Sequence, residues 1–317
     1  MAVQPRLGLC SNGRPGPRPG HRHRSVAVGA DLATVTLLLR AAGAGLAGIM
    51  MILLITPAAH ANNRFLGLDF GQSDLLDDVG DFWAEVTEGL QIKLGVGVSV
   101  APRYEGDNSY KARVLPRFAL RYKDLIALNN TRLRVFVVHN ETFVTGVQAR
   151  YVFGRYERAS PDLAGLGNVG DSLEMGGFAE WRPGWAVVGL EFGQDVAGGH
   201  HGFVANLYMG SELPLGGGWA LHGGAQVTWA SDHYMQRNFG VTPAQSAASG
   251  LPVFDAESGL EQAAVRVGVR FAKWRHWRFD TYVAYARLLA DAAHNPLVET
   301  RGSPNQFTWA ISGEYRF

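Results

Sequence analysis

The sequence of 317 residues contains a single cysteine, Cys10. One cysteine allows no internal disulfide and no thiolate cluster around a metal. The mean hydropathy of −0.03 excludes a bundle of membrane-spanning helices. The apolar run at residues 41–55 is shorter than the roughly 20 residues that a spanning helix needs, and no stretch of twenty apolar residues follows it.

Familiar catalytic motifs are also missing. The sequence has no G-x-S-x-G, no H-E-x-x-H and no Walker loop. Gly95-Val96-Gly97 resembles the start of a dinucleotide fingerprint, but it lies within a predicted strand and no helix follows it. We therefore predict a protein that is not an enzyme, with no cofactor and with no catalytic, cofactor-binding or metal-binding residues to assign.

Histidines supply the two best alternatives to that prediction. The segment Gly198–Gly202 holds His200 and His201, with Asp195 nearby, and two adjacent histidines on a glycine-rich loop can bind a transition metal. Such residues more often form a polar loop. Ser231, Asp232 and His233 are the best set for a lipid esterase at a barrel rim, but neighbours at a strand end point apart.

The N-terminus has the layout of a secretory signal. Arginines precede the apolar run at 41–55, and Ala59-His60-Ala61 forms a small-x-small cleavage site. We predict a signal peptide at 1–61, cleaved after Ala61; an uncleaved inner-membrane anchor and a later start codon are the alternatives. The six arginines and one aspartate before residue 62 leave 23 basic against 27 acidic side chains after it, which argues against nucleic-acid binding.

Two different spacings of apolar residues follow the predicted signal peptide. At residues 62–90 the apolar side chains recur every three to four positions, which predicts a short helix over 74–90 that plugs the barrel, caps its periplasmic mouth or lies at the membrane surface. From Gln91 the period is two. The last strand, 306–317, places Trp309 and the terminal Phe317 on an apolar face, a pattern typical of the final strand of an outer-membrane barrel.

Strand counting predicts an all-β, closed antiparallel transmembrane barrel of about twelve strands at 91–317, with ten as the alternative. Twelve requires a weak strand at Ile126–Asn129, with a hairpin turn at Asn129-Asn130. An even number places the short turns at the periplasmic end. The long connections, at 154–171, 195–201, 230–259 and 289–305, then share the other end. A soluble β-sandwich is the alternative, but only closure pairs every backbone group within lipid.

Charged residues on these strands are predicted to face the lumen, with His222. They are either an ion-paired filling or the lining of a narrow channel. The set comprises Arg150, Arg266, Arg270, Arg278, Glu174, Glu180, Glu191 and Asp280.

Several segments together resemble the MipA/OmpV family (MltA-interacting protein and outer-membrane protein V). The resemblance runs from about Gly95 to the end, and its most specific stretch is Tyr234–Ser246. That stretch departs from the usual pattern in having Met-Gln-Arg-Asn before Phe239. The other segments are Gly95-Val96-Gly97, Pro102–Gly106, Leu115-Pro116, Gly154-Arg155, Leu166-Gly167, Glu174–Gly177, Asp195, Gly199–Gly202 and Tyr315-Arg316-Phe317.

The resemblance implies an outer-membrane protein of a Gram-negative bacterium that acts as a scaffold for a lytic transglycosylase and a murein synthase. A small-solute channel and a surface adhesin are the alternatives. The expected partners are membrane lipid, these periplasmic enzymes and, through the strand that ends at Phe317, the barrel-assembly machinery. The resemblance assigns no partner-binding residue.

Overall fold

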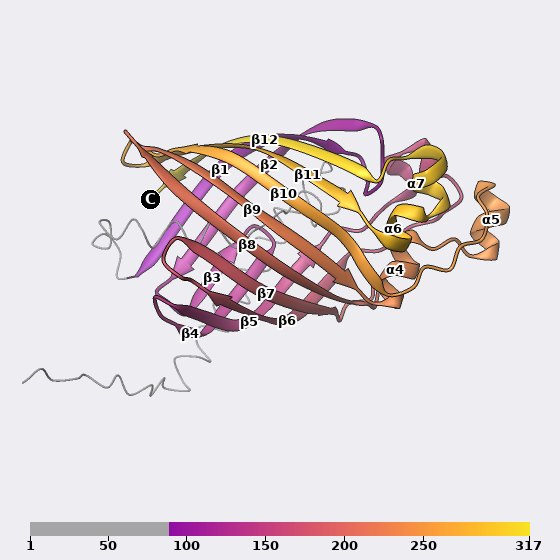
Figure 1. Ribbon diagram of the computed structural model, residues 1–317, viewed down its shortest axis with the longest axis horizontal. Helices are drawn as coiled ribbons and strands as arrows, with labels where there is room; N and C mark the ends of the chain where they lie inside the picture. The colour runs from indigo at the N-terminus through magenta and orange to yellow at the C-terminus, as the bar shows by residue number, and fades with distance from the viewer. Residues whose placement is uncertain (1–88) are drawn as a thin grey trace, which may run out of the picture. The chain divides into compact units, whose positions relative to one another are not determined.

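The computed structural model describes residues 89–317, which form a closed antiparallel barrel of twelve strands. Each strand pairs with its neighbours in sequence, and the last strand pairs with the first (Figure 1). The strands are β1 (Leu90–Pro102), β2 (Tyr110–Tyr122), β3 (Ile126–Asn129), β4 (Arg132–His139), β5 (Phe143–Val152), β6 (Ser172–Trp181), β7 (Ala186–Asp195), β8 (Phe203–Gly216), β9 (Trp219–Ala230), β10 (Gly259–Phe271), β11 (Trp277–Leu288) and β12 (Asn305–Arg316).

The predicted fold class and the predicted strand number are therefore confirmed, including the weak strand at Ile126–Asn129. Its hairpin turn lies one residue later than predicted, at 130–131, where Asn130 adopts a left-handed φ of 49°. The predicted signal peptide lies outside the described residues. So does the predicted helix at 74–90, apart from its last two residues, where Leu90 begins β1.

Alternation along each strand separates an apolar exterior from a polar interior. On β10, Val265 and Val267 are more than half exposed, while Ala264 and Arg270 are buried. A soluble protein would bury such valines, whereas acyl chains solvate them in a membrane. Among residues 89–317, no helix combines the length and apolar character needed to cross a membrane.

The two ends of the barrel differ, as the loop lengths predict. Short turns join the strands at the end where the C-terminus lies (Figure 1). Exposed tryptophans mark this end, as expected for an interfacial aromatic belt. They are Trp181, Trp185, Trp219, Trp274 and Trp277.

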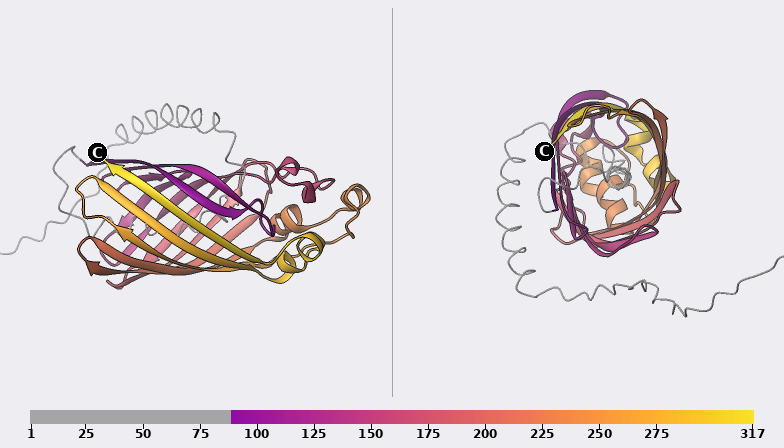
Figure 2. Two further views of the ribbon diagram at one scale, coloured as in Figure 1. Left: turned by 90° about the horizontal axis from the view of Figure 1, so that it is seen from above. Right: turned by 90° about the vertical axis from the view of Figure 1, so that its left-hand side faces the viewer.

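Long connections at the opposite end contain short helices that the sequence analysis missed. These are η2 (Glu157–Ala159), η3 (Pro161–Leu163), α4 (Asp232–Phe239), α5 (Pro243–Ser249), α6 (Ala290–His294) and α7 (Pro296–Arg301). Seen along the barrel axis, the orange segment that holds α4 lies within the outline of the barrel (Figure 2).

Candidate functional site: the charged lumen and the outer cap

Charge on the inner wall is separated by sign. Strands β2–β5 carry no Asp or Glu, and strands β6–β8 carry no Lys or Arg. The cations are Arg113, Arg117, Arg121, Arg132, Arg134 and Arg150, with the exposed Lys111 at the outer end of β2, and the carboxylates are Glu174, Glu180, Glu191, Asp195 and Glu212. Because the two sets lie on adjacent parts of the wall, each can neutralise the other without leaving the barrel.

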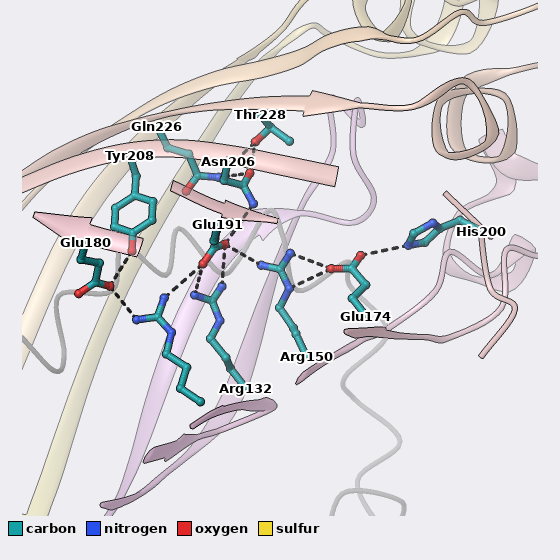
Figure 3. Close-up of polar contacts among 11 residues, drawn as sticks. Arg132, Arg150, Glu174, Glu180, Glu191, His200, Asn206, Tyr208, Gln226 and Thr228 are labelled. Carbon is teal, nitrogen blue, oxygen red and sulfur yellow. Dashed lines mark hydrogen bonds and ion pairs between the residues drawn. The ribbon is translucent and has the colours of Figure 1, made fainter. Parts of the chain in front are cut away.

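Glu191 of β7 is the centre of this arrangement (Figure 3). Its carboxylate accepts hydrogen bonds from Arg132 at 2.7 Å and from Arg134 at 3.2 Å. Arg150 and the Asn206 amide donate to the other oxygen, at 3.4 and 3.1 Å. One buried carboxylate thus links β4, β5, β7 and β8, so its loss would remove the counter-charge that Arg132, Arg134 and Arg150 share.

Two further carboxylates extend the cluster in opposite directions. Toward the long loops, Glu174 pairs with Arg150 at 2.8 Å and with the His200 ring at 3.0 Å (Figure 3). Toward the short turns, Glu180 pairs with Arg134 at 2.8 Å and accepts a hydrogen bond from the Tyr208 hydroxyl at 2.6 Å. The cluster therefore runs along much of the inner wall, from a loop histidine to the periplasmic half.

A second, smaller cluster lies across β8–β12. His222 is 2.9 Å from Asp280, whose other neighbour, Arg270, also pairs with Glu212. Arg117 of β2 pairs with Glu314 of β12. Seven of the residues predicted to face the lumen thus lie in two paired groups rather than in one row; they are Arg150, Glu174, Glu180, Glu191, His222, Arg270 and Asp280.

The long loops pack into a compact cap over the outer mouth. Tyr104, Leu163 and Leu297 belong to one buried apolar cluster, which joins the β1–β2, β5–β6 and β11–β12 connections. Tyr234 and Met235 of α4 belong to a second cluster, in which their side chains are no more than 1% exposed. The cap is therefore built as a small hydrophobic core and not as a set of free loops.

Polar contacts fix the cap further. The Gln245 side-chain amide donates to the Leu166 carbonyl at 2.5 Å, and Thr242 with Gln245 forms a capping box that begins α5. The Arg301 guanidinium donates to the carbonyls of Asp162 and Ser249 at 3.0 and 2.9 Å. The segments that carry the family resemblance, Leu166-Gly167 and Tyr234–Ser246, thus meet in the cap.

A small cavity lies where three segments of the family resemblance converge, namely Pro102–Gly106, Gly154-Arg155 and Tyr234–Ser246. Its lining includes Tyr104, Glu105, Arg155 and Phe239. Burial lowers the pKa of the Arg155 guanidinium to about 10, so this group stays cationic at neutral pH. Burial also raises the pKa of Tyr104, whose hydroxyl remains a donor. Such a cation and donor suit a bound water or small anion, although the space is close to that of one water.

In the candidate metal site, hydrogen bonds within the protein engage both Asp195 and the His200 ring. Asp195 accepts the backbone N–H groups of His200 and His201 at 2.9 and 2.8 Å. The His200 ring uses one nitrogen toward Glu174 and the other as acceptor for the Gly202 N–H. Within residues 89–317, no group of three or more His, Cys, Asp and Glu side chains is arranged to hold a metal.

The three candidate esterase residues lie at the start of a helix, whereas the sequence analysis expected them at the end of a strand. Ser231 precedes α4 and accepts the Phe203 N–H at 2.9 Å, whereas Asp232 and His233 lie in the first turn of that helix and are exposed. These residues begin a helix and do not end a strand. Sequence reasoning also missed Arg132 and Arg134, although their alternation at Arg132-x-Arg134 in a short strand is a signal for two inward cations.

Comparisons with known proteins cover solved structures, curated proteins and family models. The chain is similar to the NanC porin (9% identity, TM-score 0.40, 70% of this chain and 98% of that one). It is also similar to an outer membrane channel from Pseudomonas putida F1 (11%, 0.37, 72% and 96%) and to OmpT of Vibrio cholerae (8%, 0.33, 72% and 97%). No curated protein matches.

The family model described as MltA-interacting protein MipA matches residues 94–317. That range begins within β1 and includes every later strand and the whole cap. Together with the closed barrel, the match places the protein in the outer membrane of a Gram-negative bacterium. The chain belongs to the MltA-interacting protein MipA family.

Proposed function

We propose that this protein is a non-enzymatic platform in the outer membrane, which holds a lytic transglycosylase together with a murein synthase beside the peptidoglycan. The observation that carries the proposal is the family match, whose description names an interaction with MltA, over nearly the whole described chain. A barrel fixed in lipid raises the effective concentration of two enzymes that bind the same molecule.

The asymmetry of the barrel supports a platform that works from its periplasmic side. The outer mouth is covered by the packed cap, so the long loops are engaged with one another. The short turns carry strongly exposed aromatic side chains, with Trp185 72% and Trp274 58% exposed. Tryptophan is enriched at protein interfaces as well as at membrane interfaces, so the same residues suit both roles.

The test uses the full protein in lipid nanodiscs and a purified MltA-type transglycosylase. We expect the wild type to bind the enzyme, and the double variant Trp185→Ser, Trp274→Ser to bind more weakly. The matched control is Trp229→Ser, Trp309→Ser, which removes two exposed tryptophans at the opposite end and leaves binding unchanged. Absence of binding by the wild type, or equal losses in both variants, contradicts the proposal.

A small-solute channel is the second candidate, favoured by the polar inner wall. It predicts discrete conductance steps in a planar bilayer, and a silent bilayer would eliminate it. The adhesin alternative predicts that deletion of 232–256 abolishes surface attachment. Because that segment holds Tyr234 and Met235 of the cap core, substitutions at exposed residues of α5 are the cleaner test.

A further inference from the structure

The pairing of the barrel wall is interrupted beside β2. This strand pairs with β1 over its whole length, from Tyr110 to Tyr122, but with β3 only over its last four residues, Ala119–Tyr122. At the top of β3, Phe118 exchanges hydrogen bonds with Asn130, at 2.8 and 2.9 Å. Above that point, no strand within residues 89–317 pairs with β2 on this side.

The interruption exposes backbone groups of known identity. Residues of an antiparallel strand turn their N–H and C=O groups alternately to the two neighbours. Because Phe118 faces β3, the residues that face the open side are Pro116, Val114 and Ala112. Pro116 has no backbone N–H, so this residue leaves no unsatisfied donor on the unpaired side of β2. Ala112 and Val114 leave two donors to be satisfied, and an unpaired donor in hydrocarbon is costly.

The interruption has a defined frame, which we call the β2 gap: the open edge of β2 at residues 110–117, the β3–β4 turn at 130–131, and the cap above. The cap reaches across because Tyr104, before β2, packs with Leu163 and Leu166 of the β5–β6 connection. The side chains on the outer face of the edge are exposed and apolar; they are Tyr110, Ala112, Val114 and Pro116.

Cations lie at the outer end of the gap. The Lys111 side chain is exposed and forms no hydrogen bond or ion pair with residues 89–317, and the Arg103 guanidinium has no carboxylate within ion-pair distance there. Asp107 of the same loop is fully buried and accepts the Ser109 N–H. The Arg113 guanidinium donates to the carbonyls of Pro102 and Arg103, which holds this corner in place.

We propose that the β2 gap binds a phosphate-bearing lipid of the outer leaflet. One acyl chain lies along Ala112–Pro116, and the phosphate binds Lys111 and Arg103. An ester or amide oxygen of the lipid accepts the Ala112 N–H. Five extended residues span about 15 Å, which matches about half of a hydrocarbon core of roughly 30 Å. A protein strand is the poorer occupant, because Pro116 interrupts the donors that strand addition needs.

The experiment measures lipid retention by native mass spectrometry of the full protein released from detergent. The probes are phosphatidylglycerol and phosphatidylcholine with identical acyl chains. We expect preferential retention of phosphatidylglycerol, weakened about fivefold for each cation removed in Lys111→Gln and Arg103→Gln. Lys273→Gln, at a short turn, is the matched control and retains the wild-type preference.

A second pair of variants tests the acyl chain. Val114→Trp fills the edge and is expected to abolish the preference, whereas Val267→Trp, at a similarly exposed position on the fully paired β10, leaves it intact. Heat-dependent migration on gels confirms that each variant is folded. Equal retention of the two lipids, equal effects of the two tryptophans, or displacement of the lipid by millimolar inorganic phosphate alone would overturn the proposal.

Discussion

The two sides of the barrel wall are built differently. Strands β8–β12 are 12 to 14 residues long and pair along most of their length, with β8 and β9 matched from Val204 to Gly216. On the other side β3 has four residues and β4 has eight. The side with less backbone pairing carries the larger cluster of buried ion pairs, which joins Arg132 and Arg134 of β4 to Glu180 and Glu191.

The difference indicates that backbone hydrogen bonds hold the long strands, whereas side-chain ion pairs help to hold the short ones. A long strand is held by its ladder of hydrogen bonds, and its inner face is free to carry small residues. A short hairpin has few such bonds, so charge-assisted bonds from β4 to β6 and β7 add the missing connection across the wall. Buried ion pairs are costly to break although they contribute little when compared with apolar packing. The comparison is therefore best tested by removing one partner at a time.

The largest expected effect comes from Glu191→Gln. The amide keeps the shape of the side chain but leaves Arg132, Arg134 and Arg150 without their shared counter-charge. We expect a loss of about 3 to 5 kcal/mol in the free energy of unfolding, measured by urea titration in lipid vesicles. Glu212→Gln, which removes one partner of Arg270 on the long-strand side, is the control and should cost less. Equal losses would contradict the comparison.

A smaller effect is expected where a glycine permits close approach of β4 and β5. A Cβ at Gly146 would lie 2.0 Å from the Val135 carbonyl oxygen, so Gly146→Ala must push the short strand away. We expect a cost of about 1 to 3 kcal/mol in the same titration. At Gly223 of the long strand β9, the nearest atom to an added Cβ is 3.1 Å away, and Gly223→Ala should be tolerated better. The reverse order would show that β4 is not held at its present distance.

The smallest effect is expected at the open edge. Pro116→Ala adds an N–H that has no strand partner within residues 89–317, so we expect the free energy of unfolding to fall by about 1 kcal/mol. Val98→Pro, on the fully paired β1, removes a ladder hydrogen bond and should cost about 3 kcal/mol or more. A gain in stability in Pro116→Ala would mean that the added N–H finds a strand partner and that this edge is paired.

Some of this architecture is readable from the sequence because the signal is local. Period-two alternation assigns Val265 and Val267 to the outside, and Arg266 and Arg270 to the inside, without knowledge of any neighbour. Loop lengths and the even strand number identify the weak strand at Ile126–Asn129. Both arguments need only the covalent geometry of a strand and the closure of a barrel.

The candidate sites depend on distant partners, and this is why the sequence did not reveal them. Arg132 meets Glu191, 59 residues later, only because β4 to β7 pair in one particular register. The β2 gap depends on where β3 stops, and nothing in the β2 sequence except Pro116 marks it. Helix α4 does leave a local signal, since Tyr234, Met235 and Phe239 recur at helical spacing within a segment predicted as loop.

The central claim is that acyl chains solvate the outer face of every strand while the inner face is polar. Spin labels at successive positions 264 to 269 of β10 test it most directly, because oxygen concentrates in lipid and a charged nickel chelate stays in water. The predicted result is a period-two alternation, with oxygen collisions highest at Val265, Val267 and Val269. Uniform accessibility along the strand, or nickel access at Val267, would contradict the account.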